Sequence, residues 1–511
     1  MKKLGLLSLG AAILLSLGSF GQSFAADDRS IEQLRAEAEN PMIVSITADD
    51  RKQVADIANM GFDIAEVKKG TVTVLATKTN LKKLDKRGIR YAITNPNANS
   101  MLTRFRAGTA LGKYHSYEQI QQILKDAEAN NPNICKVKVI GKSFEGRDIY
   151  AINITGNAGA KAKKPAGLIM GLHHSREWIS AEVPLALVNE LVEKYAKDDT
   201  IKKLVDGRDI WIVPVVNPDG FTYSQTKSKM WRKNRRLNSD KSYGVDPNRN
   251  YGYEWGDVGS SNYMGDDTYH GTKAFSEPCT QAIKKLAEEH NFVGDITFHS
   301  YSELILYPFS YAYEAYAKDD KLFAQLAGEM AKFNGYTPQK SSDLYPSMGD
   351  TDDFMYGAHG SLSFTFELGS TFIPADSDVP KICGDNVKAC LYLLDKIGTT
   401  HASTHPDFAS PTVVATARYI YAAAVSNQKD VSARSVLVNL LNPANDKNAA
   451  NLEEFISEVA KSDMNSKQLL LPVLKEVKSM YMTEVLNKTG NTRQTIRRIE
   501  KLQSEIIQIN E

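Results

Sequence analysis

A histidine and a glutamate three residues apart are the first side chains in this sequence that suggest chemistry. His174 and Glu177 lie in the segment 171–179, Gly-Leu-His-His-Ser-Arg-Glu-Trp-Ile, which joins an expected strand to an expected helix. One helical turn brings both side chains to one side, as two ligands of one metal ion require. His173 is instead four residues from Glu177. Such a pair alone is commonly a solvated helix start, so a third ligand is needed.

His299 is the candidate third ligand. It ends the expected strand Asp-Ile-Thr-Phe-His, and ligands of open α/β sheets gather at the carboxyl ends of strands. His174 follows another such strand. Two histidines and one glutamate leave a fourth position for water, which is typical of catalytic zinc. Without His174 and Glu177, a satisfied core histidine would be the preferred explanation of His299.

Further charged residues are expected at the same sheet edge. Glu367 ends the apolar strand Ser-Phe-Thr-Phe-Glu, where an unpaired buried charge is costly. This position favours a general base, with a buried salt bridge as the alternative. Arg232 and the pair Asn248-Arg249 lie in loops between strands. An arginine beside an asparagine can hold a carboxylate through forked hydrogen bonds, although each alone would be an ordinary surface residue.

The elements that must position these residues fill the middle of a chain of 511 residues, for which two or three domains are expected. Residues 111–398 alternate expected strands and helices, as in an α/β domain. Expected strands are 166–172, 209–217, 295–299 and 361–368, and expected helices include 181–196 and 280–289. Residues 399–511 are interpreted as a linker and a helical C-terminal region, with amphipathic runs at 451–460 and 492–509.

A smaller α+β domain is expected at 26–110. Its pattern predicts the order βαββαβ, with strands at 42–48, 62–67, 71–77 and 89–93 and helices at 50–60 and 80–87. A loop with Arg104, Arg106 and Lys113 follows and suits proteolysis. Residues 1–25 resemble a secretory signal: Lys2 and Lys3, an apolar run, and a cleavage site after Ala25. This predicts a secreted protein, extracellular or periplasmic. A membrane anchor is disfavoured because the run is short and contains glycines.

Composition excludes one class of partner. Lysine and arginine total 62, aspartate and glutamate 61, and the net charge is +1. A nucleic-acid-binding protein normally has a clear basic excess. Cys383 and Cys390, two of the four cysteines, would lie about 10 Å apart on a helix, too far for a disulfide. A break at Gly384 would permit one, and free buried thiols remain the alternative.

Seven segments occur in the order and spacing of a known family. They are His-Ser-Arg-Glu-Trp-Ile at 174–179, Asn-Pro-Asp-Gly at 217–220, Trp-Arg-Lys at 231–233, Gly-Val-Asp-Pro-Asn-Arg-Asn at 244–250, Tyr-His-Gly at 269–271, His-Ser-Tyr at 299–301 and Phe-Thr-Phe-Glu-Leu at 364–368. Together they resemble the zinc metallocarboxypeptidases of the carboxypeptidase A/B family. The resemblance implies a mixed eight-stranded sheet between helices, with one zinc ion per chain.

The resemblance also implies an exopeptidase that acts on peptide or protein C-termini. It suggests a secreted bacterial member similar to carboxypeptidases B or T, whose pro-domain an activating protease removes. The implied roles are His174, Glu177 and His299 as zinc ligands, Glu367 as general base, Arg232 as oxyanion stabiliser, Asn248, Arg249 and Tyr345 as binders of the terminal carboxylate, Arg176 as a contact for residues further from the cleaved bond, and Asp246 as the residue that orients His174.

Substrate preference is inferred from the loop 345–354. The family residue before the Asp-aromatic pair lines the specificity pocket, and here it is Asp352. Asp350 adds a second acid, and Ser310 resembles the small polar residue of the basic-specific branch. An acid in a partly dry pocket favours C-terminal lysine or arginine. Dual specificity is the alternative, as are solvated acids or pairing with Lys340.

Some observations depart from the family or leave other functions open. Lys229 stands where the family has a second arginine, three residues before Arg232. A cell-wall peptide hydrolase of the same fold and an inactive binding module are the rival functions, but no ligand or base is missing. Asp257, Asp266 and Asp267 are candidate calcium ligands, although a solvated acidic loop is the simpler explanation.

Overall fold

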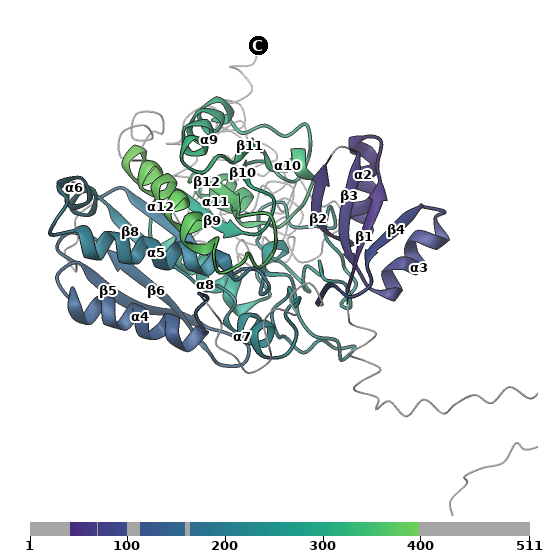
Figure 1. Cartoon of the computed structure of the whole chain (residues 1–511), viewed down its shortest axis with the longest axis horizontal. Coiled ribbons are helices and arrows are strands. Elements are labelled where there is room, and N and C mark those ends of the chain that lie inside the picture. The colour runs from purple at the N-terminus through teal and green to yellow at the C-terminus, as the bar shows by residue number, and fades with distance from the viewer. Residues whose placement is uncertain (1–40, 69, 100–112, 159–163, 398–511) are drawn as a thin grey trace, which may run out of the picture. The chain divides into compact units, whose positions relative to one another are not determined.

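The structure is a computed structural model of the chain, and it describes residues 41–397 except 69, 100–112 and 159–163. The signal segment, Arg104, Arg106 and the region 399–511 therefore lie outside the described residues. The described part contains two sheets, one of four strands and one of eight (Figure 1). Within that part, no helix has the length and apolarity that a bilayer crossing requires.

The four-stranded sheet belongs to the N-terminal unit, residues 41–99. Its elements follow the predicted βαββαβ order: β1 (Met42–Thr47), α2 (Arg51–Asn59), β2 (Asp63–Lys68), β3 (Thr71–Ala76), α3 (Lys78–Lys86) and β4 (Tyr91–Asn95). The strands are arranged β2-β3-β1-β4, so β2 is an edge strand. Asp50 and Thr77 cap α2 and α3 through their side chains. Buried aliphatic residues give this unit a core of its own.

The eight-stranded sheet is mixed and confirms the predicted fold class. Its order is β11-β10-β12-β9-β7-β8-β6-β5. The central strands β12, β9, β7 and β8 run parallel to one another, and the outer strands include antiparallel pairs. The strands are β5 (Cys135–Lys142), β6 (Asp148–Ile154), β7 (Ala166–Met170), β8 (Asp209–Val213), β9 (Phe292–His299), β10 (Leu304–Tyr307), β11 (Thr337–Lys340) and β12 (Leu362–Glu367).

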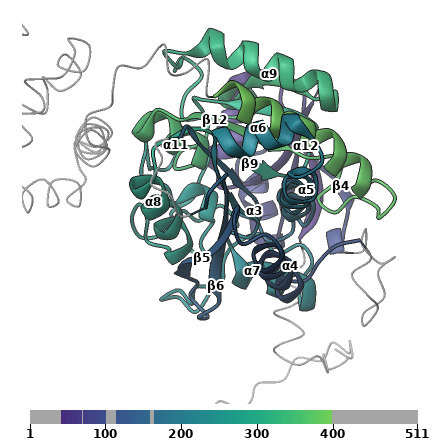
Figure 2. The same ribbon diagram turned by 90° about the vertical axis from the view of Figure 1, so that its left-hand side faces the viewer.

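Helices cover both faces of this sheet. They are α4 (Tyr117–Asn130), α5 (Ile179–Lys194), α6 (Asp199–Gly207), α7 (Pro218–Thr226), α8 (Pro278–Glu289), α9 (Asp320–Asn334), α10 (Ser341–Leu344), α11 (Thr351–His359) and α12 (Val379–Lys396). Figure 2 shows α5 and α12 on one side and α8 and α11 on the other. Side chains of β7 alternate between two cores: Ile169 joins the first, and Leu168 and Met170 join the second.

The four cysteines are free and buried. The helix α12 continues through Gly384, so Cys383 and Cys390 lie two turns apart on the same helix. A disulfide between them is therefore absent, and the alternative of free buried thiols holds.

Candidate active site

The loop between β7 and α5 carries His174 and Glu177. These residues form a tight turn rather than the predicted helical turn, since α5 begins only at Ile179. The hydroxyl of Ser180 accepts from the backbone N–H of Leu172 and donates to the Glu177 carbonyl, which fixes both ends of the loop. Gly171 allows this closeness, because a Cβ there would lie 2.0 Å from the Ser180 carbonyl oxygen.

The three predicted ligands converge at the carboxyl end of the sheet. Nδ1 of His174 lies 2.9 Å from Oε1 of Glu177, and Nδ1 of His299 lies 3.0 Å from Oε2. The two ring nitrogens are 3.1 Å apart, and all three residues are buried. Two imidazole nitrogens and a carboxylate that face one point are the donor set of a zinc site. The residues therefore fit the metal ion that the sequence predicts.

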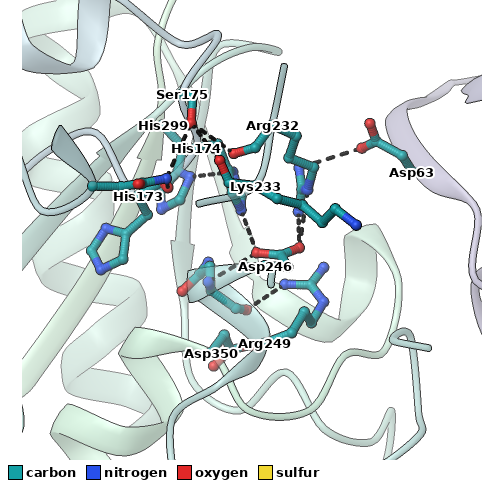
Figure 3. Close-up of polar contacts among 12 residues, drawn as sticks. Asp63, His173, His174, Ser175, Arg232, Lys233, Asp246, Arg249, His299 and Asp350 are labelled. Carbon is teal, nitrogen blue, oxygen red and sulfur yellow. Dashed lines mark hydrogen bonds and ion pairs between the residues drawn. The ribbon is translucent and has the colours of Figure 1, made fainter. Parts of the chain in front are cut away.

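Asp246 connects the ligands to a neighbouring cation. It accepts from Nε2 of His174 at 3.1 Å and from Nη2 of Arg232 at 2.8 Å (Figure 3). A proton on Nε2 leaves the Nδ1 lone pair of His174 free for a metal. Burial acts to raise the pKa of Asp246, but the charge of Arg232 and the hydrogen bond from His174 lower it well below its usual range. Asp246 thus remains an anion.

Glu367 ends β12 directly beside His299. The two residues are partners in the parallel register of β12 and β9, so both lie at the same sheet edge. Burial and then the nearby charge of Glu177 raise the pKa of Glu367 well above its usual range. Glu367 and Arg232 line the same cavity as the zinc ligands.

The predicted carboxylate clamp is assembled around a short 3-10 helix, Pro247–Arg249. Arg249 donates from Nε to the Gly259 carbonyl at 2.9 Å and from Nη2 to the Tyr345 hydroxyl at 3.0 Å. Oδ1 of Asn248 accepts from the backbone N–H and hydroxyl of Thr351. These contacts hold the guanidinium and the amide at the cavity, where Asn248, Arg249 and Tyr345 are all found.

Acidic residues gather in the same cavity. Asp350 and Asp352 line it with Ser310, and they are only 4% and 3% exposed, so they are not solvated loop acids. Ser310 donates to Asp350, and Ser341 donates to Oδ2 of Asp352 at 2.6 Å. Burial and then the charge of Asp350 raise the pKa of Asp352 well above its usual range.

The expected alternative that Lys340 neutralises these acids is wrong. Its ammonium donates to the backbone carbonyls of Tyr313 and Ala315. Asp353 is a third buried acid of the group, and it accepts from the backbone N–H groups of Ser310 and Tyr311. Among the described residues, no lysine, arginine or histidine forms an ion pair with any of the three acids.

The candidate calcium ligands are not gathered into a site. Among the described residues, two groups are spaced to share a metal ion: His174, Glu177 and His299, and Asp350, Asp352 and Asp353. None of the candidate calcium ligands belongs to either group. Asp266 instead pairs with Lys83 at 2.8 Å, and Asp257 contacts His270 at 2.9 Å. The calcium expectation therefore gains no support.

Sequence reasoning missed a residue from the N-terminal unit. Asp63, the first residue of the edge strand β2, accepts from Nη1 and Nη2 of Arg176 at 2.5 and 2.8 Å. Oδ1 of Asp63 also lies 3.3 Å from Nη1 of Arg232, an ion pair drawn in Figure 3. Ile64 and Ala65 line the same cavity. Asp63 lies in the expected strand 62–67, and nothing local links it to residues more than 100 positions away.

Comparisons with known proteins agree with this geometry. A family model described as zinc carboxypeptidase matches residues 120–389. Carboxypeptidase B of Homo sapiens is 32% identical over 387 residues, which cover 72% of this chain and 90% of that protein. Carboxypeptidase B of Rattus norvegicus is 33% identical over 334 residues, which cover 61% and 80%.

Solved structures share the fold. Carboxypeptidase A from Helicoverpa armigera has a TM-score of 0.63 at 23% identity and covers 71% of this chain and 99% of its own. The structure of thrombin activatable fibrinolysis inhibitor has a TM-score of 0.59 at 26% identity, with the same coverage. Both superpositions agree with the observed mixed sheet and its flanking helices.

Proposed function

This chain belongs to the zinc carboxypeptidase family, and from that premise we propose that it is a secreted enzyme that removes C-terminal lysine or arginine and is made as a latent precursor. Zinc carboxypeptidase activity follows from the family. The substrate preference, the latency and the export are the proposed additions. Export rests on the N-terminal pattern with its cleavage site after Ala25.

The proposed roles follow from where each side chain lies. His174, Glu177 and His299 hold zinc, which when bound polarises the scissile carbonyl and lowers the pKa of water. Glu367 takes the proton of the attacking water and returns it to the leaving amine. Arg232, held by Asp246, donates to the oxygen that becomes negative in the transition state.

Three further side chains are proposed to recognise the C-terminus of the substrate. The guanidinium of Arg249, the amide of Asn248 and the hydroxyl of Tyr345 bind the terminal carboxylate, because a fork of donors matches two carboxylate oxygens. Arg176 contacts residues further from the cleaved bond. This clamp favours ordinary peptide C-termini over the cell-wall peptides of the rival hydrolase.

One observation supports the basic preference: Asp350, Asp352 and Asp353 are buried together, and none of them has a cationic partner among the described residues. Unpaired buried charge is strongly unfavourable. A substrate lysine or arginine supplies the missing charge, whereas an apolar side chain leaves the carboxylates unpaired. Dual specificity is the second candidate, since two of the acids can remain neutral by sharing protons.

The test compares kcat/KM for peptides that end in Arg, Lys, Phe or Leu, with wild type and Asp352→Ile. We expect the wild type to favour Arg over Phe by at least about 100-fold, as one desolvated charge contact of about 3 kcal/mol allows. Asp352→Ile should reverse much of that ratio. Asp343→Asn, at an exposed acid of α10, is the matched control and should keep the wild-type ratio. A wild type that prefers Phe, or an unchanged ratio in Asp352→Ile, contradicts the basic preference.

Latency is proposed from the ion pairs of Asp63. In that position its carboxylate occupies Arg176 and Arg232, the two arginines assigned to substrate and transition state. We therefore assign residues 26–110 as a pro-domain, 111–398 as the catalytic domain and 399–511 as a linker and C-terminal region. A protease that cuts after Arg104, Arg106 or Lys113 would release the inhibition.

A further inference from the structure

A histidine without a role in the proposed reaction lies directly behind the zinc ligands. His173 is fully buried, and its ring stacks on that of His299 with centroids 5.5 Å apart and an interplanar angle of 20°. Its ring nitrogens contact Thr297, Tyr251 and Thr351 rather than the ligand cluster. The described residues that line the cavity include the three ligands but not His173, so His173 contacts the ligands from outside the cavity.

A zinc ligand must direct a ring nitrogen without a proton toward the metal, and this requirement assigns the hydrogen atoms of His299, Thr297 and His173. Nδ1 of His299 faces the other ligands, so its proton must sit on Nε2. That nitrogen lies 3.5 Å from Oγ1 of Thr297, which accepts from it. The single hydroxyl hydrogen of Thr297 is then directed to Nδ1 of His173, 3.2 Å away. A chain of hydrogen bonds thus links His299 to His173 through the hydroxyl of Thr297.

The chain of hydrogen bonds continues from His173 to the carboxylate clamp. Because Nδ1 accepts, Nε2 of His173 carries the proton, and it lies 2.8 Å from the Tyr251 hydroxyl and 3.3 Å from Oγ1 of Thr351. The Thr351 hydroxyl donates to Oδ1 of Asn248 at 2.6 Å. Since this oxygen is occupied, the amide nitrogen of Asn248 is the group that remains for a substrate carboxylate.

We propose that His173 is a positioning residue, which fixes the proton and ring plane of His299 on one side and, through Thr351, the amide of Asn248 on the other. An imidazole has an acceptor and a donor at separate ring positions, and an aliphatic side chain has neither. The proposal rests on the assignment of His299 as a zinc ligand. Loss of such an outer partner typically weakens metal binding by about 10- to 100-fold.

The test is the zinc affinity of the full-length protein, measured by competition with a chelator. His173→Leu and Thr297→Val should each weaken zinc binding about 10- to 100-fold. Thr297→Ser, the matched control, keeps the hydroxyl and should stay near wild type. The visible spectrum of the cobalt-substituted protein should change in the first two variants and not in the third. The double variant His173→Leu/Thr297→Val should bind zinc about as well as the weaker single variant, since both changes break the same chain of hydrogen bonds.

Wild-type affinity and an unchanged cobalt spectrum in Thr297→Val would overturn the proposal, as would additive losses in the double variant. Should His173→Leu fail to fold, the Thr297 pair carries the test alone. A wild-type protein that binds no zinc would instead contradict the metal site itself, so the two failures are distinguishable.

The clamp end is tested separately on the activated enzyme. Thr351→Val should raise KM by about tenfold with a smaller change in kcat, because one hydrogen bond that orients Asn248 is lost. Thr351→Ser should restore the wild-type KM. An unchanged KM in Thr351→Val overturns the link to Asn248.

Discussion

At the scale of single residues, the site depends on side chains whose hydrogen-bonding groups are nearly all assigned. Arg249 shows this best, because its Nε and Nη1 donate to the backbone carbonyls of Gly259 and Asn248. Only its Nη2 edge, shared with the Tyr345 hydroxyl, remains for a substrate carboxylate. The backbone contacts thus set the direction of the fork.

Arg249→Lys should therefore not be a conservative change. Lysine keeps the charge but cannot hold both backbone carbonyls and the substrate from one fork. We expect kcat/KM for a peptide with a free C-terminus to fall about 10- to 100-fold, the effect of a lost charge-assisted hydrogen bond. The same peptide with an amidated C-terminus reports background activity. A variant with wild-type kcat/KM would contradict the assigned clamp.

Residues that form local motifs could be predicted, and residues defined by distant neighbours could not. His174 and Glu177 are three positions apart and directly visible in the sequence. Asp63 and Thr297 have ordinary local surroundings, and their partners come from other elements. Their importance is tertiary, and one sequence alone carries no signal for it.

At the scale of elements, the strands β9 and β12 position two residues of the site. Their parallel register places His299 beside Glu367 at the carboxyl end, and it places Asp295 beside Ser363 inside the sheet. Ser361 and Ser363 donate to the two oxygens of Asp295 at 2.5 and 2.6 Å. An acid is thereby buried in the strand pair that carries the site.

This acid predicts a pH dependence of stability. Burial raises the pKa of Asp295 to about 7, and the two serines oppose that rise. A raised folded pKa stabilises the fold fully below the unfolded pKa of about 4, and the stabilisation is lost as pH rises through about 7. Relative to Asp295→Asn, the wild-type free energy of unfolding should fall by about 2.5 kcal/mol between pH 5 and pH 8. Urea denaturation at both pH values measures this difference, and parallel pH profiles would contradict it.

The strand ends were predictable because apolar β-branched runs stop at polar residues, as in Asp-Ile-Thr-Phe-His. The helical turn expected at His174 and Glu177 was wrong, since Ser180 and Gly171 fold the segment into a turn before α5. Periodicity identifies an amphipathic helix, but it does not reveal a loop held by a side-chain hydrogen bond. The domain limits at 110 and 398 remain predictions, because their flanking residues lie outside the described chain.

At the scale of the whole molecule, the N-terminal unit and the α/β unit share one cavity. Besides Asp63, the contact includes Lys83, which donates to both oxygens of Asp266. Gly61 approaches the same acid so closely that a Cβ would lie 2.7 Å from its Oδ2. Neither contact involves a residue with a proposed role in the reaction, so we expect them to hold the N-terminal unit without affecting the chemistry.

Asp63→Ala should make the uncleaved protein partly active. The change frees Arg176 and Arg232, and the remaining contacts still hold the N-terminal unit in place. We expect activity of the full-length variant on a small substrate to rise at least about tenfold above wild type, as loss of a buried ion pair allows. Asp56→Ala, at an exposed acid of α2 paired with Lys52, is the matched control. A full-length wild type that is as active as protein trimmed near Lys113 would contradict latency.

The most direct measurement of the central claim is the release of free arginine from a peptide that ends in arginine, by activated wild type and by Glu367→Gln, alongside the zinc content of each. We predict that a chelator stops the wild-type reaction and that added zinc restores it. Glu367→Gln should keep one zinc ion per chain and lose turnover by about 10³-fold or more, the usual effect of removing a general base. Near-wild-type turnover in that variant, or a zinc-loaded wild type that releases no terminal residue, would contradict the account.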